Sequence, residues 1–170
     1  WIRPVGFNSD ESKALVLDSR DGGTEAVGFA DLRLQTVEYL YRDAMTDITG
    51  YDIDESDQIY AASTGIGKPR RTILDPDHPR VASLQRLEAS FPEEAVRIVS
   101  STRDGKLHLV GTYSDKNAGT YYLYDQSVGE LKYLLARRPW IKEADGYATT
   151  DFFFEARDGL QITGLLTMPE

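Results

Sequence analysis

The sequence has no cysteine, which excludes disulfide bonds, thiolate zinc sites and a cysteine nucleophile. Apolar runs are short, and none approaches the roughly 18 residues of a membrane-spanning helix, so we expect no membrane partner. No basic and then apolar leader follows Trp1, so no signal peptide is recognisable. Because the chain starts at Trp1 rather than at Met, we expect it to be a piece of a longer protein.

Positive charge is also scarce. The 170 residues include 28 acidic and 19 basic side chains, which gives a net charge of −9. The densest basic stretches, residues 68–71 and 137–138, are short. Nucleic acids and anionic membrane surfaces attract clustered Lys and Arg, so we expect neither as a partner. With 41% apolar and 28% charged residues, the composition is that of a globular domain.

An internal repeat is the most informative feature of the sequence. Asp10, Asp54 and Asp104 each lie in a polar turn between two apolar segments, and their spacings are 44 and 50 residues. Four-stranded propeller blades repeat at about 40 to 50 residues. The overall offset of 94 residues also aligns later parts of the first unit with the third, without a gap: Asp31 with Asp125, Val37 with Leu131, Tyr39 with Tyr133 and Leu40 with Leu134.

Short segments rich in Tyr, Val and Leu, separated by turn-forming residues, predict an all-β fold. We expect a partial β-propeller over residues 1–136, with about three four-stranded blades at about 1–44, 45–94 and 95–136, followed by a C-terminal hairpin. The strands predicted for the first and third blades are residues 5–8, 14–17, 26–30, 36–40, 96–100, 107–113, 120–124 and 131–135.

The middle blade is predicted to carry one helical insert over residues 79–90. Four apolar residues recur there at helical spacing: Val81, Leu84, Leu87 and Phe91. We expect Asp77 to cap the N-terminus, Pro79 to occupy the first turn and Pro92 to end the helix. The apolar stripe is expected to pack against a blade edge or a neighbouring domain.

Residues 137–150 are predicted to be a linker, and residues 151–170 contain a hairpin with the turn Arg157-Asp158-Gly159. The segment from Phe154 to Pro169, FEARDGLQITGLLTMP, resembles the start of the α/β-hydrolase domain in prolyl oligopeptidase family serine peptidases, which include dipeptidyl-peptidase-like and acylaminoacyl-peptidase-like branches. Residues 119–125 and 137–140 resemble the last propeller blade and the linker of that family. The resemblance extends over residues 49–170.

This resemblance implies a two-domain serine peptidase, in which a propeller covers a hydrolase domain with a Ser-Asp-His triad. The triad would follow Glu170, so we assign no catalytic, cofactor-binding or metal-binding residue here and expect no cofactor. The implied role of the propeller is to gate and position peptide substrates. The implied partners are that peptide and the hydrolase domain of the same chain. Many bacterial members are exported, which favours a periplasmic or secreted location over a cytoplasmic one.

The other candidate catalytic and phosphate-binding motifs in the sequence are incomplete. A nucleophile elbow needs Gly-x-Ser-x-Gly, but residues 63–67, Ser-Thr-Gly-Ile-Gly, lack the glycine before the serine. Pro69 after Lys68 also departs from the phosphate-binding loop. We interpret this segment as a flexible loop between two strands. We interpret His78 as solvent-exposed near a helix start, and His108 as an outward-facing residue of a strand.

Acidic clusters are expected by chance in so acidic a chain. Residues 52–57 place four carboxylates as in half of a calcium loop, but the glycine at the sixth position and the glutamate at the twelfth are missing. Dipeptidyl peptidases of the family bind the substrate amino terminus with adjacent glutamates. The residues around Glu93 and Glu94 do not match that motif, and we do not carry the role over. Whether either acidic segment binds a ligand stays open from the sequence.

A second interpretation is a freestanding propeller that binds other proteins and has no enzymatic activity. A freestanding propeller closes its ring by pairing its terminal strands, whereas residues 151–170 follow a linker and form a separate hairpin, which favours the peptidase interpretation. Three blades leave sheet edges exposed in either case. We therefore expect the fragment to oligomerise through blade edges or to be marginally stable.

Overall fold

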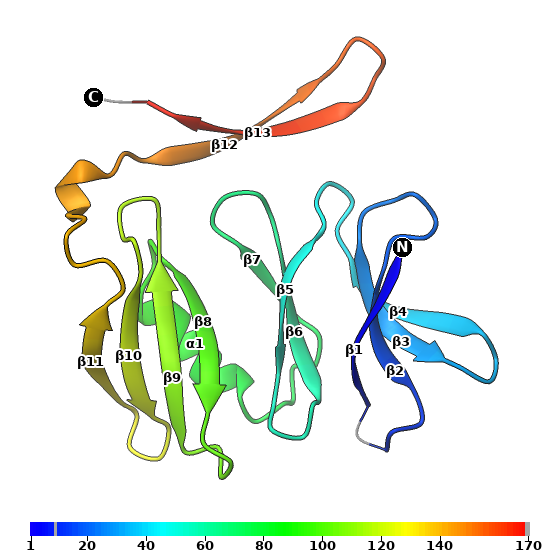
Figure 1. Ribbon diagram of the computed structural model, residues 1–170, viewed down its shortest axis with the longest axis horizontal. Helices are drawn as coiled ribbons and strands as arrows, with labels where there is room; N and C mark the ends of the chain where they lie inside the picture. The colour runs from blue at the N-terminus through cyan, green and yellow to red at the C-terminus, as the bar shows by residue number, and fades with distance from the viewer. Residues whose placement is uncertain (9, 169–170) are drawn as a thin grey trace. The chain divides into compact units, whose positions relative to one another are not determined.

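The computed structural model describes residues 1–8 and 10–168, which form an all-β fold with one α-helix (Figure 1). The strands form three antiparallel sheets and a separate two-stranded hairpin, and within each sheet consecutive strands are neighbours. This meander topology is that of propeller blades, as expected. The chain divides into two compact units, Trp1–His78 with Ala156–Gln161, and Pro79–Glu155 with the described part of the chain from Ile162 on, and each unit is described by itself.

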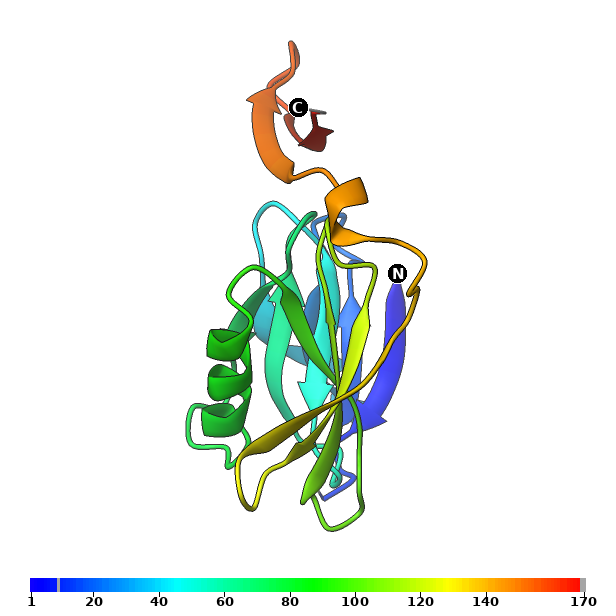
Figure 2. The same ribbon diagram turned by 90° about the vertical axis from the view of Figure 1, so that its left-hand side faces the viewer.

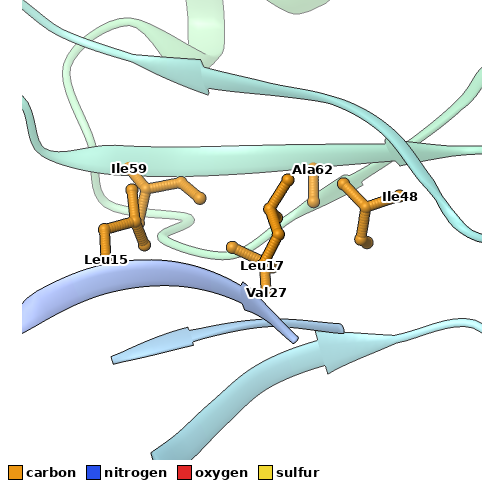
Figure 3. Packing of buried hydrophobic residues seen from close by; sticks show 6 residues of the cluster. All are labelled: Leu15, Leu17, Val27, Ile48, Ile59 and Ala62. Atoms are coloured by element: carbon orange, nitrogen blue, oxygen red, sulfur yellow. The ribbon is translucent and has the colours of Figure 1, made fainter. Parts of the chain in front are cut away.

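The first unit contains two sheets that pack face to face. Leucines of β2 project toward the second sheet and contact apolar side chains of β5 and β6 (Figure 3). The facing buried residues are Leu15, Leu17, Val27, Ile48, Ile59 and Ala62. The first sheet has the order β1 (Ile2–Phe7), β2 (Ala14–Asp18), β3 (Ala26–Asp31), β4 (Thr36–Arg42), and the second has the order β5 (Ile48–Ile53), β6 (Ile59–Thr64), β7 (Arg70–Ile73).

The second unit begins with α1 (Val81–Ser90), which packs on one face of a four-stranded sheet. Leu87 contacts Val96, Val110 and Tyr124 of that sheet. From the last strand the chain runs through the short helix η1 into the hairpin (Figure 2). The elements are β8 (Ala95–Ser101), β9 (Leu107–Tyr113), β10 (Thr120–Asp125), β11 (Glu130–Ala136), η1 (Glu143–Asp145), β12 (Thr149–Glu155) and β13 (Gln161–Thr167). No helix within the described ranges has the length and apolarity that crossing a membrane requires.

The turns confirm the predicted repeat. In each of the three sheets the repeat aspartate closes the first hairpin turn, because its carboxylate accepts the backbone N–H two residues later. The distances are 3.0 Å from Ser12 to Asp10, 2.8 Å from Ser56 to Asp54 and 3.2 Å from Lys106 to Asp104. This is the local hydrogen bond that makes Asp a turn-former. Asp31 and Asp125 bind the N–H groups of Arg33 and Ser127 in the same way.

Irregularities in strand pairing repeat with the same 94-residue offset. The pairing of β1 with β2 shifts between Pro4 and Gly6, and that of β8 with β9 shifts between Ile98 and Ser100. The pairing of β3 with β4 shifts between Val27 and Gly28, and that of β10 with β11 shifts between Tyr121 and Tyr122. A bulge inserts one residue and strengthens the local twist. The β1–β4 sheet and the β8–β11 sheet therefore share one pattern of strand pairing.

The middle blade differs from the predicted four-stranded plan. Its described sheet has three strands, and the last of them, β7, is four residues long. After β7 the chain contains Pro76 and Pro79, which have no N–H to donate to a strand ladder. The chain turns there instead and enters α1.

The predicted start of the helix was also wrong. The helix begins at Val81 rather than at residue 79, and its N-cap residue is Arg80, whose side chain makes no capping hydrogen bond. Asp77 does not cap the helix, because it lies in a preceding turn and donates its own N–H to the carboxylate of Asp75 at 3.2 Å. The helix ends at Ser90, two residues before Pro92.

Candidate functional site

The serine of the Ser63–Gly67 segment lies inside a strand. Ser63 and Thr64 are buried in β6, and the Thr64 hydroxyl donates to the carboxylate of Asp43. The loop begins only at Gly65, whose φ of +110° is a conformation that glycine adopts readily. A nucleophile elbow exposes its serine on a turn between a strand and a helix. The buried position of Ser63 excludes that role.

His78 is not exposed, contrary to the sequence interpretation. Only 8% of its surface is accessible, and its ring stacks on Tyr60 with centroids 4.5 Å apart. Its Nε2 atom lies 3.3 Å from a carboxylate oxygen of Asp54. Burial opposes ionisation of Asp54, but the N–H groups of Gln58 and Ser56 together with His78 lower the pKa of this carboxyl. The histidine therefore fastens the segment after β7 to the turn of the second blade.

His108 is also buried, at 1% exposure, rather than outward-facing. Its Nδ1 atom lies 2.8 Å from the Ser101 hydroxyl, and its Nε2 atom lies 2.8 Å from Oε1 of Gln126. Because a side-chain carbonyl oxygen only accepts, Nε2 carries the proton and Ser101 donates to Nδ1. Burial lowers the pKa of His108, and the nearby guanidinium of Arg80 acts in the same direction. The imidazole is therefore neutral at pH 7.

Ser101, His108 and Gln126 superficially resemble a nucleophile, a base and an orienting group. In serine hydrolases the histidine must reach both the serine and the substrate, and an anionic carboxylate stabilises the imidazolium. Here the ring is inaccessible, the orienting group is a neutral amide, and Ser101 also accepts a hydrogen bond from Arg80 at 3.3 Å. We interpret the trio as a polar network around a buried histidine rather than as a catalytic site.

The acidic residues around the second blade turn have separate structural partners. Asp52 pairs with Arg71 at 2.8 Å, and both side chains are almost fully buried. Asp54 holds its turn together and contacts His78. Among the described residues no group of three or more His, Asp or Glu side chains is arranged to hold a metal ion.

Glu93 and Glu94 lie in the turn between α1 and β8. Glu94 accepts a hydrogen bond from the side-chain amide of Asn117 at 2.9 Å, whereas Glu93 is exposed. The two carboxylates therefore have different surroundings. Nearby, Phe91 at the end of α1 packs against Tyr122 of β10 with ring centroids 5.1 Å apart.

A further ionic cluster was missed by the sequence analysis. Asp18, fully buried at the end of β2, accepts hydrogen bonds from the guanidinium of Arg20 and, at 3.0 Å, from the hydroxyl of Tyr39. The Arg20 contact outweighs burial and strongly lowers the pKa of Asp18. The spacing of two residues between Asp18 and Arg20 was the available signal, but nothing in the sequence indicated that Asp18 is buried.

The C-terminal hairpin presents apolar side chains on both of its faces. Phe152 stacks on Phe154 with centroids 6.0 Å apart and lies over Gly164, whereas Phe153 points to the opposite face of β12 by strand alternation. All three phenylalanines are at least 40% exposed. At its base, the N–H of Thr149 donates to the carboxylate of Asp115 at 2.5 Å. A two-stranded hairpin is only marginally stable alone, so both apolar faces require packing against other segments.

Comparison with known proteins finds distant structural similarity but no match in sequence. No family model matches the chain, and no curated protein matches it in sequence. Among solved structures, a prolyl endopeptidase from a study of inter-domain dynamics in catalysis and specificity matches with a TM-score of 0.47 and 13% sequence identity. The match covers 91% of this chain and 23% of that chain, so the chain spans about a quarter of the neighbour's length.

Proposed function

We propose that this chain is part of the β-propeller of a prolyl oligopeptidase family serine peptidase, together with the first two strands of its α/β-hydrolase domain. In this proposal the blades restrict access to the active site and position short peptide substrates. The order of the features supports it. Repeated sheets are followed by a linker over residues 137–148 and then by the hairpin whose sequence resembles the start of that hydrolase domain.

The observation that carries the proposal is the apolar character of both faces of the β12–β13 hairpin. In β12, Phe152 and Phe154 share one face and Phe153 lies on the other, and in β13 Leu165 and Leu166 also lie on opposite faces and are about half exposed. The last blade of a partial propeller lacks a neighbouring sheet on one of its two faces only. A strand pair that must be covered on both faces belongs in a sheet with layers on each side, as in α/β domains.

In this proposal the propeller blades and the hydrolase domain have separate roles. Ser63, His78 and His108 are buried, and Ser101 is partly buried; all four serve packing or hydrogen bonding. In this proposal the blades therefore supply no catalytic group. The nucleophilic serine and its histidine base belong, in this proposal, to the hydrolase domain that continues the hairpin. Peptide cleavage then proceeds by attack of the serine on the carbonyl carbon, with the histidine accepting the serine proton.

The test begins with the coding sequence that follows Glu170. We expect a Gly-x-Ser-x-Gly motif, and then an aspartate and a histidine in that order. In the complete protein, replacing that serine by alanine abolishes hydrolysis of a chromogenic proline-containing peptide. Phe153→Asp is expected to reduce the activity and folding yield, with the matched change Val128→Asp, on an exposed loop of the third blade, as the control. A stop codon soon after Glu170 would overturn the proposal and favour the freestanding interaction propeller.

A further inference from the structure

The Ser101–His108–Gln126 network is an addition to the blade and not a requirement of its fold. With the 94-residue offset, these residues correspond to Phe7, Ala14 and Leu32 of the first blade. Phe7 pairs with Ala14 in β1 and β2, as Ser101 pairs with His108 in β8 and β9. The same backbone is therefore built without a titratable group at this position. A buried histidine here calls for an explanation beyond blade formation.

The network is connected to the start of α1. Arg80, which is 6% exposed and immediately precedes the helix, donates through Nη1 to the Ser101 hydroxyl at 3.3 Å. Ser101 in turn donates to Nδ1 of His108. Because α1 has no side-chain N-cap of its own, this contact is one of those that hold the beginning of the helix on the third sheet.

Protonation of His108 is incompatible with this arrangement. Among the described residues, the ring contacts Ser101 from β8, Gln126 after β10 and the ring of Tyr124 from β10, and the guanidinium of Arg80 lies nearby. None of these is a carboxylate. A proton on Nδ1 would force the Ser101 hydroxyl to turn and accept, and would add a second positive charge close to Arg80 in a buried site.

We propose that the start of α1 is attached to the third sheet by a proton-sensitive contact that runs from Arg80 through Ser101 to His108. This contact breaks when His108 is protonated and is intact at neutral pH. Because burial depresses the pKa of His108 in the folded state, its contribution to stability is complete above the ordinary value of 6.5 and is lost as the pH falls below it.

His78 provides an internal contrast on the other side of the same segment. Its Nε2 atom lies 3.3 Å from a carboxylate oxygen of Asp54, whereas the two ring nitrogens of His108 face a hydroxyl and an amide oxygen. Between pH 7 and 5, loosening is expected at the α1 side of the segment.

The experiment is hydrogen exchange by mass spectrometry on peptides covering residues 80–90, from pH 7.5 to 5.0, corrected for intrinsic exchange rates. Protection of α1 in the wild-type chain is expected to fall below pH 6.5, by at most about tenfold per pH unit, which is the slope for one proton. His108→Gln is expected to remove this pH dependence. His78→Gln, the matched control, is expected to retain it.

A parallel measurement needs no variant. The imidazole signals of both histidines are followed by NMR over the same pH range, and the loss of α1 protection is expected to begin below pH 6.5 and to level off where His108 titrates in the folded chain. Protection that does not change with pH overturns the proposal. So does a loss of protection that follows the titration of His78, or a pH dependence that persists in His108→Gln.

Discussion

Thr112 offers a sharp test of the packing in the third blade. Its side chain lies in the central strand β9 and is 2% exposed, and its Oγ1 atom is buried without a hydrogen-bond partner among the described residues. A buried polar atom left unsatisfied costs about 1–3 kcal/mol. Thr112→Val keeps the branched shape and replaces the hydroxyl by a methyl group. We therefore expect the variant to be more stable than the wild type by about 1–2 kcal/mol.

The repeat explains why this hydroxyl lacks a partner. With the 94-residue offset Thr112 corresponds to Asp18, and Ser114 corresponds to Arg20. In the first blade the buried carboxylate is satisfied by the guanidinium two residues later. In the third blade the shorter Ser114 side chain stands in its place and binds backbone N–H groups of its own loop instead.

The measurement is urea unfolding followed by circular dichroism, together with a thermal scan. For a chain of this size a gain of 1 kcal/mol corresponds to an increase of about 2–4 °C in Tm. Thr112→Ser is the control, because it keeps the hydroxyl and loses the methyl group, and we expect it to be less stable than the wild type by about 1 kcal/mol. If Thr112→Val proves no more stable than the wild type, Oγ1 is satisfied in solution by a bound water and the reasoning is refuted.

Three further predictions follow from the described contacts. Leu17→Ala, in the interface between the first two sheets, is expected to cost about 2–5 kcal/mol in urea unfolding, whereas the exposed Leu34→Ala is expected to change stability by less than about 0.5 kcal/mol. Wild-type stability is expected to fall as the pH drops below 3.8 toward the lowered pKa of Asp18. Asp18→Asn is expected to be less stable than the wild type at pH 7 and to show a weaker decline of stability in acid. If stability depends on pH in the same way in both proteins, the role given to Arg20 and Tyr39 is contradicted. Sedimentation velocity should show oligomers that form through exposed strand edges, and a sharply monomeric species with cooperative unfolding at high temperature would contradict the partial-propeller interpretation.

The regular elements were predictable because their signals are local. Alternating apolar residues and Asp-containing turns define strands such as β9, whose predicted bounds match the observed bounds. The bulges were not predicted, but they recur with the same 94-residue offset as the aligned aspartates. The helix start was less predictable, because Asp75 and Asp77 compete as local hydrogen-bond acceptors and Asp75 closes the turn.

The surroundings of the two histidines were not predictable from local sequence. His78 lies among Asp and Pro residues, which is typical of an exposed loop, yet a long-range stack on Tyr60 buries it. His108 alternates with leucines in a strand, and the period of two does not say which face a neighbouring element covers. Burial in both cases depends on contacts between segments 18 or more residues apart, such as the one from His108 to Gln126.

Comparison of equivalent positions in the first and third blades separates what the fold needs from what it tolerates. The turn aspartates and the bulges recur, so they belong to the blade. The chemical identity of the buried side chains at these positions does not recur: Asp18 becomes Thr112, and Ala14 becomes His108. A buried polar group costs stability unless it is hydrogen-bonded, so a change of this kind is tolerated only where partners change with it. His108 has gained Ser101 and Gln126, whereas Thr112 has gained no partner among the described residues. The site around His108 is therefore where we expect a function specific to the third blade, and Thr112 is the position at which a substitution is expected to stabilise that blade.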